Sequence, residues 1–394
     1  MTIEHASCTE KIEYAIRDVV VLAQKFENVL YLNIGDPNKF DFYTPQHMID
    51  SVYTAMKKNY NGYAPSEGIT EAREAVVEDA LKKKINCCAD DVLITTGVSE
   101  AIELSLSALI DPGENFLTPN PGYPLYTALV SKLNAKLNPY DLSEENGWQP
   151  DIESIKNSIN EQTKALIVIN PNNPTGSVCD KEILIQILEL AQENNLVVLA
   201  DEIYDKLVFE KEHTPLASIA GDIPIISFNG LSKSYLVPGW RMGWMIFHDP
   251  NDTMTGYTDA IRKLVRARLC ANHPLQYAIK PALSGPQDHL DDFRTKLRAR
   301  GAFTEKRINE IPGLKCNPIS GAFYAFPTID LNNFDLKTDK EFVISLLEEE
   351  QVLCVHGSGF GRDNAFRIVF LPPMETLEEA YNRIERFCKR HYID

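Results

Sequence analysis

The chain has 394 residues, of which 44% are hydrophobic and 24% are charged. This composition is typical of one large globular domain with a second subdomain, or of two domains. The formal net charge is −17, from 39 basic and 56 acidic residues, which disfavours nucleic acid and membranes as partners because both require a positive surface. No signal peptide and no apolar run long enough to cross a bilayer is visible, so we expect a cytoplasmic protein.

The eight cysteines and eight histidines are scattered along the chain. Cys87 and Cys88 are adjacent, and no Cys-x-x-Cys pair occurs. In a chain without a secretion signal this pattern indicates reduced, mostly buried thiols. We therefore expect neither a disulfide framework nor a metal site.

Short apolar segments alternate with longer amphipathic ones through much of the chain. Six segments are predicted to be buried strands: Asp91–Thr95, Asn115–Thr118, Ala165–Ile169, Leu196–Ala200, Ile225–Phe228 and Gly243–Phe247. Helices are expected at Ser99–Ile110, from near Tyr123, and at Asp180–Asn194. This α/β alternation predicts a mostly parallel central sheet sandwiched by helices, in a large domain of residues 46–285.

The two ends of the chain have a different pattern. After about Pro286 we expect long charged helices, a hairpin around Gly321–Pro327, a helix near Lys340–Glu350 and a final helix. The Tyr31–Ile34 segment needs a strand partner. Residues 1–45 and 286–394 are therefore predicted to form together a smaller α+β domain.

Polar residues stand at the carboxyl ends of four predicted strands. These segments are Gly97-Val98-Ser99, NPNNPTG (Asn170–Gly176), DEIY (Asp201–Tyr204) and NGLSK (Asn229–Lys233). In an open parallel sheet, ligands bind beyond the carboxyl ends of the strands. The sequence therefore predicts one site at which these four segments meet.

The motifs NPxNPTG, DEIY and SKxxxxPGWRxGW occur in this order, between YLNIGDP near the start and FRIVF near the end. As an ordered set they are far more specific than any one of them. Over nearly the whole chain they resemble the class I aminotransferases, which are pyridoxal 5′-phosphate (PLP) enzymes of fold type I. The resemblance implies the fold of a fold type I PLP-dependent transferase, with PLP as cofactor.

The resemblance also implies roles for the motif residues. Lys233 would hold PLP as a Schiff base and then move a proton between the substrate Cα and C4′ of the cofactor. Most lysines lie on the surface, but a lysine desolvated after a buried strand has a lowered pKa and is a competent nucleophile. Asp201 would keep the pyridine nitrogen protonated so that the ring acts as an electron sink. The alternative is that Asp201 only ends a strand or caps a helix. Tyr204 and Asn173 would hydrogen-bond O3′, although Asn-Pro turn chemistry alone also explains Asn173.

The cofactor phosphate needs hydrogen-bond donors. The backbone N–H groups of Gly97, Val98 and Ser99 at a helix start form an anion site, although a plain helix cap gives the same pattern. Arg241 would add charged hydrogen bonds.

One position departs from the family pattern, because Gly230 replaces a serine that often contacts phosphate in relatives. Ser232 is expected to compensate. Tyr123 is expected to stack on the pyridine face, although a core tyrosine gives the same signal. Tyr63 matches a tyrosine that reaches the phosphate of the neighbouring subunit, which implies a homodimer with shared active sites.

Arg367 is expected to bind the substrate carboxylate as a bidentate pair, with a buried structural ion pair as the alternative. Gly35 would add a backbone contact to the same carboxylate. The stretches YAIRDVV, NIGDPNKFDF, GWQPDI and RLCANHP resemble alanine aminotransferases of bacteria and archaea. In that case Arg17, with Tyr14 nearby, would hold the distal carboxylate of glutamate or 2-oxoglutarate, unless Arg17 is a solvated helix charge.

We therefore expect a ping-pong aminotransferase acting on an amino acid, with alanine first, and on 2-oxoglutarate or pyruvate. YLVPGWRMGW also resembles tyrosine aminotransferases, so aspartate and aromatic substrates stay open. A PLP-dependent lyase or racemase would keep Lys233, Asp201 and Arg367. A transcription regulator would need a DNA-binding domain, for which the first residues offer no basic stretch.

Overall fold

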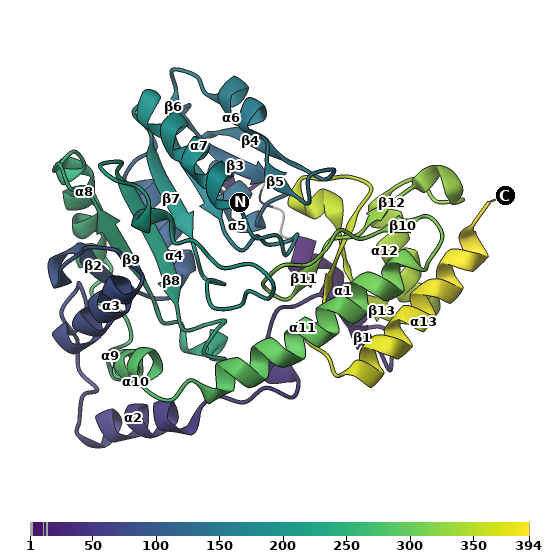
Figure 1. Cartoon of the computed structure of the whole chain (residues 1–394), viewed down its shortest axis with the longest axis horizontal. Coiled ribbons are helices and arrows are strands. Elements are labelled where there is room, and N and C mark those ends of the chain that lie inside the picture. Colours follow the sequence, from purple (N-terminus) through teal and green to yellow (C-terminus); the bar gives the residue numbers. More distant parts are fainter. Residues whose placement is uncertain (1–2, 11, 13–14, 394) are drawn as a thin grey trace.

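The structure is a computed structural model. It describes residues 3–10, 12 and 15–393, and for residues 15–18 it describes the backbone alone. A large sheet covered by helices lies beside a smaller group of helices and short strands that contains the C-terminus (Figure 1).

Within the described residues, eight strands form the central sheet in the order β2-β9-β8-β7-β6-β3-β4-β5. Their bounds are β2 (Val92–Thr95), β3 (Asn115–Asn120), β4 (Lys136–Ser143), β5 (Gln149–Pro150), β6 (Thr163–Ile169), β7 (Val197–Asp201), β8 (Ile225–Gly230) and β9 (Gly243–His248). The strands β4, β3, β6, β7 and β8 pair in parallel, so the predicted mostly parallel sheet is confirmed. The antiparallel direction of β9 and the strands β4 and β5, which extend the sheet beyond β3, were not predicted.

The side chains of the central strands alternate between two cores, as the pleat of a strand requires. In β6, Leu166 and Val168 pack in one core, and Ala165, Ile167 and Ile169 pack in the other. The first core includes helices α2 (Gln46–Lys57), α3 (Thr70–Lys82), α6 (Ile152–Ser158), α7 (Lys181–Glu193) and α10 (Ile279–Ser284). The second includes α4 (Val98–Ser107), α5 (Pro124–Lys132) and α8 (Thr255–Ala267). Helices therefore cover both faces of the sheet, as predicted.

A third core belongs mainly to the C-terminal part of the chain. Its helices are α11 (Asp288–Asn309), α12 (Asp339–Glu350) and α13 (Met374–His391). Its strands are β10 (Leu314–Lys315), β11 (Tyr324–Ala325), β12 (Thr328–Ile329), β13 (Val352–Leu353), β14 (Val355–His356) and β15 (Phe366–Val369). In Figure 1, the long helix α11 leads from the region of α10 toward this group.

The N-terminal segment joins this C-terminal group. Strand β1 (Leu30–Tyr31) pairs in parallel with β13, so the partner of the predicted N-terminal strand comes from the far end of the chain. The expected hairpin around Gly321–Pro327 is wrong, because β11 pairs with β15 and β12 pairs with β10. Long-range pairing overrides the local turn signal there.

The remaining regular elements are short. They are α1 (Ala15–Ala23), α9 (His273–Gln276) and 3-10 helices at Ser7–Thr9, Pro37–Lys39, Ala89–Asp91, Leu216–Ser218, Pro238–Trp240, Leu331–Asn333 and Gly357–Phe360. Across the described part of the chain, no helix is both long and apolar enough to cross a membrane. Among the same residues, no group of three or more His, Cys, Asp or Glu side chains is arranged to hold a metal ion.

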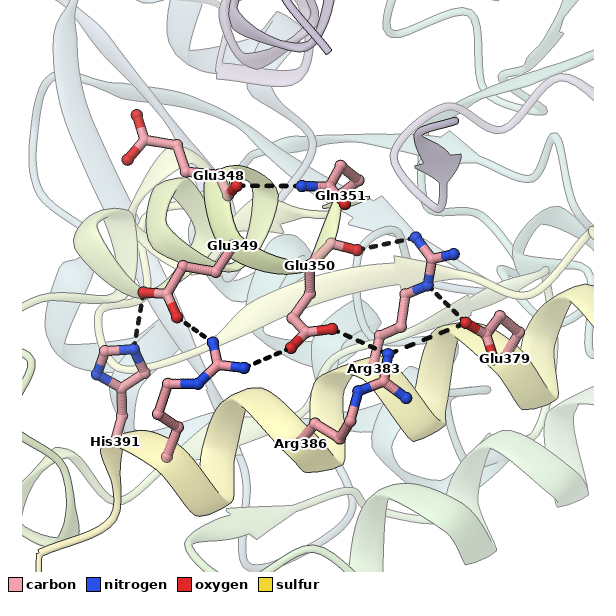
Figure 2. Close-up of polar contacts among 9 residues, drawn as sticks. Glu348, Glu349, Glu350, Gln351, Glu379, Arg383, Arg386 and His391 are labelled. Atoms are coloured by element: carbon pink, nitrogen blue, oxygen red, sulfur yellow. Dashed lines mark hydrogen bonds and ion pairs between the residues drawn. The ribbon is translucent and has the colours of Figure 1, made fainter. Parts of the chain in front are cut away.

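Helices α12 and α13 are joined by a network of ion pairs (Figure 2). Glu350, whose side chain is only 8% exposed, accepts from Arg386 at 3.0 Å and from Arg390 at 2.8 Å. Arg383 donates to the backbone carbonyl of Glu350 at 3.0 Å. His391 contacts Glu349 at 2.9 Å. The network fixes the C-terminal helix against the end of α12.

Candidate active site

A cavity of about 190 Å³ lies at the edge of the sheet where β2, β6, β7 and β8 end. Many of the predicted site residues line it: Gly35, Val98, Ser99, Tyr123, Asn173, Asp201, Tyr204, Ser232, Lys233, Arg241 and Arg367. Ile34, Ile102, Ile169, Ile203, Pro238 and Tyr324 complete the lining. The structure therefore brings the polar ends of four strands together with residues from both ends of the chain.

Lys233 lies three residues beyond the end of β8, and its side chain enters the cavity. Its Nζ donates to the carbonyl oxygen of Gly35 at 3.0 Å and lies 5.7 Å from the ring centre of Phe323. Burial lowers the pKa of Lys233 to about 8, and the positive charge of Arg367 acts in the same direction. The uncharged amine, the form that a nucleophile requires, is therefore far more populated near neutral pH than in an ordinary lysine.

Asp201 is the last residue of β7 and is 4% exposed. Its Oδ2 accepts from the hydroxyl of Tyr126 at 3.3 Å, and its Oδ1 accepts from the backbone N–H of Ile203 at 3.4 Å. Burial raises the pKa of Asp201 to about 6, while these two hydrogen bonds and the charge of Lys233 oppose the rise. A nearby cation would restore full ionisation, since it favours the charged form.

Tyr126 was not predicted. It lies in the first turn of α5, three residues after Tyr123, which immediately precedes the helix. That spacing was the signal available in the sequence. Burial raises the pKa of Tyr126 well above its usual value, and the charge of Asp201 adds to this effect, so its hydroxyl remains a donor to the carboxylate.

Asn173 and Tyr204 each contact a partner that the motifs did not indicate. The Oδ1 atom of Asn173 accepts from Nη1 of Arg367 at 3.0 Å. The hydroxyls of Tyr204 and Tyr324 lie 2.9 Å apart. Tyr324, from β11, also lines the cavity, and it was missed because a tyrosine in a short apolar strand is indistinguishable from a core residue.

The start of α4 and Arg241 meet because β9 runs antiparallel to its neighbours. In the sheet register Gly243 lies opposite Thr95, so the first residue of β9, and Arg241 just before it, lie where β2 ends. A Cβ atom at Gly97 would lie 2.4 Å from Nη2 of Arg241, and Gly97 has a φ of +76°. Only glycine allows this approach, which places a guanidinium beside the first, unpaired N–H groups of a helix.

Gly230, the position that departs from the family pattern, has no room for a side chain. A Cβ there would lie 2.6 Å from the carbonyl oxygen of Met242 and 2.9 Å from Cα of Gly243. Ser232 is 6% exposed and lines the cavity. A serine side chain is thus sterically excluded at position 230, while a hydroxyl is available two residues further on.

Arg367, in β15, is 1% exposed. Its Nη2 donates to the carbonyl oxygen of Asn33, and its guanidinium lies 4.6 Å from the ring centre of Tyr324 and 4.7 Å from that of Phe360. Arginine is suited to such a site because its planar group stacks on aromatic rings while its fork binds carboxylates. A buried positive charge therefore lines the same cavity as Asp201 and Tyr204.

Four predicted residues are not among the residues that line this cavity. Tyr63 is 81% exposed and lies near the 268–275 segment, in a different depression of the surface. Tyr14 lies outside the described residues, and so does the side chain of Arg17. Gly97 contacts Arg241 just behind the cavity wall.

One cavity beside the carboxyl edge of a mostly parallel sheet is thus lined by a buried amine of lowered pKa, a buried carboxylate and two arginines, an arrangement that suits an enzyme with the aminotransferase fold of type I. The chain belongs to the family described as "Aminotransferase class I and II", which matches residues 27–384. This family uses PLP. The protein is therefore an aminotransferase, and its substrates are an amino acid and a 2-oxo acid.

Individual relatives cover nearly the whole chain. "Glutamate-pyruvate aminotransferase AlaA" of Haemophilus influenzae is 39% identical, over 96% of this chain and 97% of its own length. The structure of "Alanine aminotransferase from Pyrococcus furiosus" matches with a TM-score of 0.96 and 46% identity, over 98% of this chain and 100% of that one. "Tyrosine aminotransferase" of Mus musculus is 36% identical, over 93% of this chain and 82% of its own length.

Proposed function

We propose that the protein is an alanine aminotransferase that moves an amino group between alanine and 2-oxoglutarate, in two half-reactions on PLP. The observation that carries this proposal is the arrangement of Lys233 and Arg367 in one cavity. An amine of lowered pKa beside a carboxylate-binding arginine suits proton transfer at the Cα of an amino acid. The names of the bacterial and archaeal relatives support alanine as the amino donor.

The residues of the cavity fit PLP. The N–H groups at the start of α4 and the guanidinium of Arg241 would hold the phosphate. A Cβ at Gly97 would collide with that guanidinium. Asp201 would pair with the pyridine nitrogen, and Tyr123 would lie against the ring. When bound, PLP supplies the electron sink for the charge that develops at the substrate Cα.

Asn173 and Tyr204 would hydrogen-bond O3′ of the cofactor. The Oδ1 atom of Asn173 accepts from Arg367, and an amide has a separate Nδ2 donor group for a second partner. Asn173 would therefore link the substrate-binding arginine to the cofactor. Ser232 is proposed as a further phosphate ligand.

The chain's own residues then account for substrate handling. Arg367 would bind the α-carboxylate in a bidentate pair, supported by the backbone of Gly35. Lys233 would move the proton at Cα, as a base of suitable pKa within the cavity. Arg17 and Tyr14 remain our candidates for the distal carboxylate of glutamate.

The proposal is tested by mixing the PLP-loaded protein with single amino acids and recording the loss of its visible absorbance. Alanine and glutamate should give the fastest stoichiometric conversion, with pyruvate and 2-oxoglutarate as products. Faster conversion with tyrosine, phenylalanine or aspartate would overturn the alanine assignment in favour of the alternatives left open by the sequence. Release of ammonia would indicate a lyase. A Lys233→Ala variant that still formed a borohydride-reducible adduct would exclude the lysine assignment.

We also propose a homodimer with shared sites. Large apolar side chains gather at the surface of α2 and its flanks: Tyr43, Ile49, Tyr53, Met56, Tyr60 and Tyr63 are all between 39% and 81% exposed. Several exposed large apolar side chains on one segment are typical of a protein interface. Tyr63 would extend from it to the phosphate of the partner subunit.

Complementation tests the shared site. Lys233→Ala and Tyr63→Ala subunits, each weakly active alone, should regain about a quarter of the wild-type activity after mixed refolding, because half the dimers then contain one intact site. No recovery of activity, although sedimentation shows that dimers have formed, would exclude shared active sites.

Two further expectations from the sequence remain proposals. One domain would comprise residues 46–285, and the other would comprise residues 1–45 together with 286–394. The protein would be cytoplasmic.

A further inference from the structure

A cluster of buried charges lies behind the segment 201–205, which leaves β7 and turns. Nζ of Lys83, the residue that directly follows α3, lies 2.7 Å from Oδ2 of Asp79 and 2.7 Å from Oδ2 of Asp205. Lys206 approaches Asp79 at 3.4 Å. The side chains of Asp205 and Asp79 are only 4% and 10% exposed, whereas Lys83 is 24% exposed, so the carboxylates of these ion pairs are largely shielded from water.

The turn has two sides with different surroundings. Asp201, Ile203 and Tyr204 line the cavity with Lys233, whereas Asp205 and Lys83 line a separate open groove. At its start the turn is held by the N–H of Glu202, which donates to the carbonyl of Phe228 at 3.0 Å. At its end the ion pair to Lys83 attaches it to α3.

The charges of this cluster depend on one another. Burial opposes ionisation of Asp205, but the ammonium groups of Lys83 and Lys206 lower its pKa to about 2. Burial likewise opposes the charge of Lys83, but Asp205 and Asp79 outweigh it and raise its pKa above the usual value. Without Lys83, two buried carboxylates would face each other with a single, more distant ammonium, and the loss of one partner of a buried ion pair is strongly unfavourable.

We propose that Lys83 is a positioning residue for the reaction: by holding Asp205 against α3, it sets the turn that directs Asp201 and Tyr204 into the cavity. The inference rests on the proposed function, since it takes Asp201 and Tyr204 as the groups that face the cofactor ring. Side-chain placement matters here because a displacement of about 1 Å in a catalytic group lowers rates by up to about a hundredfold.

The chain provides a matched control, because three lysines follow one another at positions 82–84. Lys82 is exposed, while Lys83 reaches the two carboxylates. Lys83→Met and Lys82→Met therefore remove the same charge from neighbouring positions. We expect Lys83→Met in the PLP-loaded enzyme to lower kcat on the order of tenfold to a hundredfold and to weaken PLP binding. The KM for the amino acid should change less than about twofold, since Arg367 belongs to a different strand.

Two further measurements separate positioning from general stability. In the PLP-free protein, hydrogen exchange should accelerate at the amides of Asp205 and Leu207, which bond to the carbonyls of Glu202 and Tyr204 at 3.0 Å and 2.8 Å. Lys83→Arg should restore most of the activity and of the protection, because the charge is retained. If Lys83→Met does not fold, Asp205→Asn provides the milder variant with the same expected pattern.

The outcomes distinguish the two proposals. A wild-type protein that fails to bind PLP or to transaminate would reject the proposed function. A competent wild type in which Lys83→Met equals Lys82→Met in kcat, PLP affinity and exchange would overturn the role of Lys83. A loss of global stability with unchanged exchange in the turn and unchanged PLP affinity would also overturn it.

Discussion

Arg241 and Gly97 are in direct contact although 144 residues separate them: Nη2 of the arginine occupies the space in which any Cβ at position 97 would lie, at 2.4 Å. The contact exists because β9 runs antiparallel to β8 and β2. The contact places the guanidinium of Arg241 beside the backbone N–H donors at the start of α4.

Gly97→Ala should weaken PLP binding at least about tenfold, since displacing a charged hydrogen-bond donor costs roughly 1.5–3 kcal/mol. Gly113→Ala is the matched control. Gly113 has a φ of +90°, compared with +76° for Gly97, but no atom lies within 4 Å of its Cβ position. Both variants carry the strain of a left-handed alanine, so equal PLP dissociation constants in an absorbance titration would show that Arg241 does not hold the phosphate.

Tyr126→Phe should raise the pKa of Asp201 further above its value of about 6 in the PLP-free protein, because one of the hydrogen bonds that favour the ionised carboxylate is lost. Carbon-13 NMR of the aspartate carboxyl groups measures this shift. Tyr140→Phe serves as the control, since Tyr140 is equally buried but donates to the carbonyl of Ile167 at 2.8 Å. A titration of Asp201 that is the same in both variants would contradict the hydrogen bond.

Arg367→Lys should raise the KM for both amino acid and 2-oxo acid at least about thirtyfold, because an ammonium keeps the charge but not the planar fork that matches a carboxylate. Steady-state kinetics with each substrate measure the effect. Arg362→Lys, at a half-exposed position of the neighbouring loop, should leave both constants within about twofold. A KM that is unchanged in Arg367→Lys would remove this residue from substrate binding.

His391 makes stability depend on pH at the end of α13 (Figure 2). Partial burial lowers its pKa, but hydrogen bonds to Asp335 and Glu349 prevail and raise the pKa above 6.5. The stability that protonated His391 contributes is therefore fully present below pH 6.5 and is lost as the pH rises through the raised pKa. Partial burial acts to raise the pKa of Glu349, but contacts with His391 and Arg390 lower it below 4.5, so its contribution is complete above pH 4.5.

Between pH 4.5 and pH 6.5, His391→Gln should lower the free energy of unfolding by at most about 1 kcal/mol, since Asp335 and Glu349 are partly exposed. The difference from wild type in urea denaturation should be largest near about pH 5.5 and should shrink by about pH 9. His248→Gln is the control, because His248 contacts the carbonyl of Gly221. A difference that grows with pH would contradict the ion pairs.

The sequence located six central strands and most of the residues around the cavity, because strand-end motifs have a fixed relation to the sheet edge. It did not predict that Arg367 contacts Asn173, or that Tyr324 contacts Tyr204, because these pairs depend on how the C-terminal strands dock against the large sheet. The wrong hairpin around Gly321–Pro327 has the same cause. Local sequence patterns indicate helices and strands, whereas the pairing of distant strands depends on the tertiary packing of the whole chain.

The pairing of β1 with β13, and the hydrogen bond from Arg367 to the carbonyl of Asn33, also limit when the protein can become active during its synthesis. Both segments flank the cavity, yet one is made first and the other almost last. Until β13 has been made, β1 has no strand to join, and until β15 has been made the cavity lacks Arg367. A product truncated between β13 and β15 would therefore contain all eight strands of the large sheet and the pair β1–β13, but not this arginine.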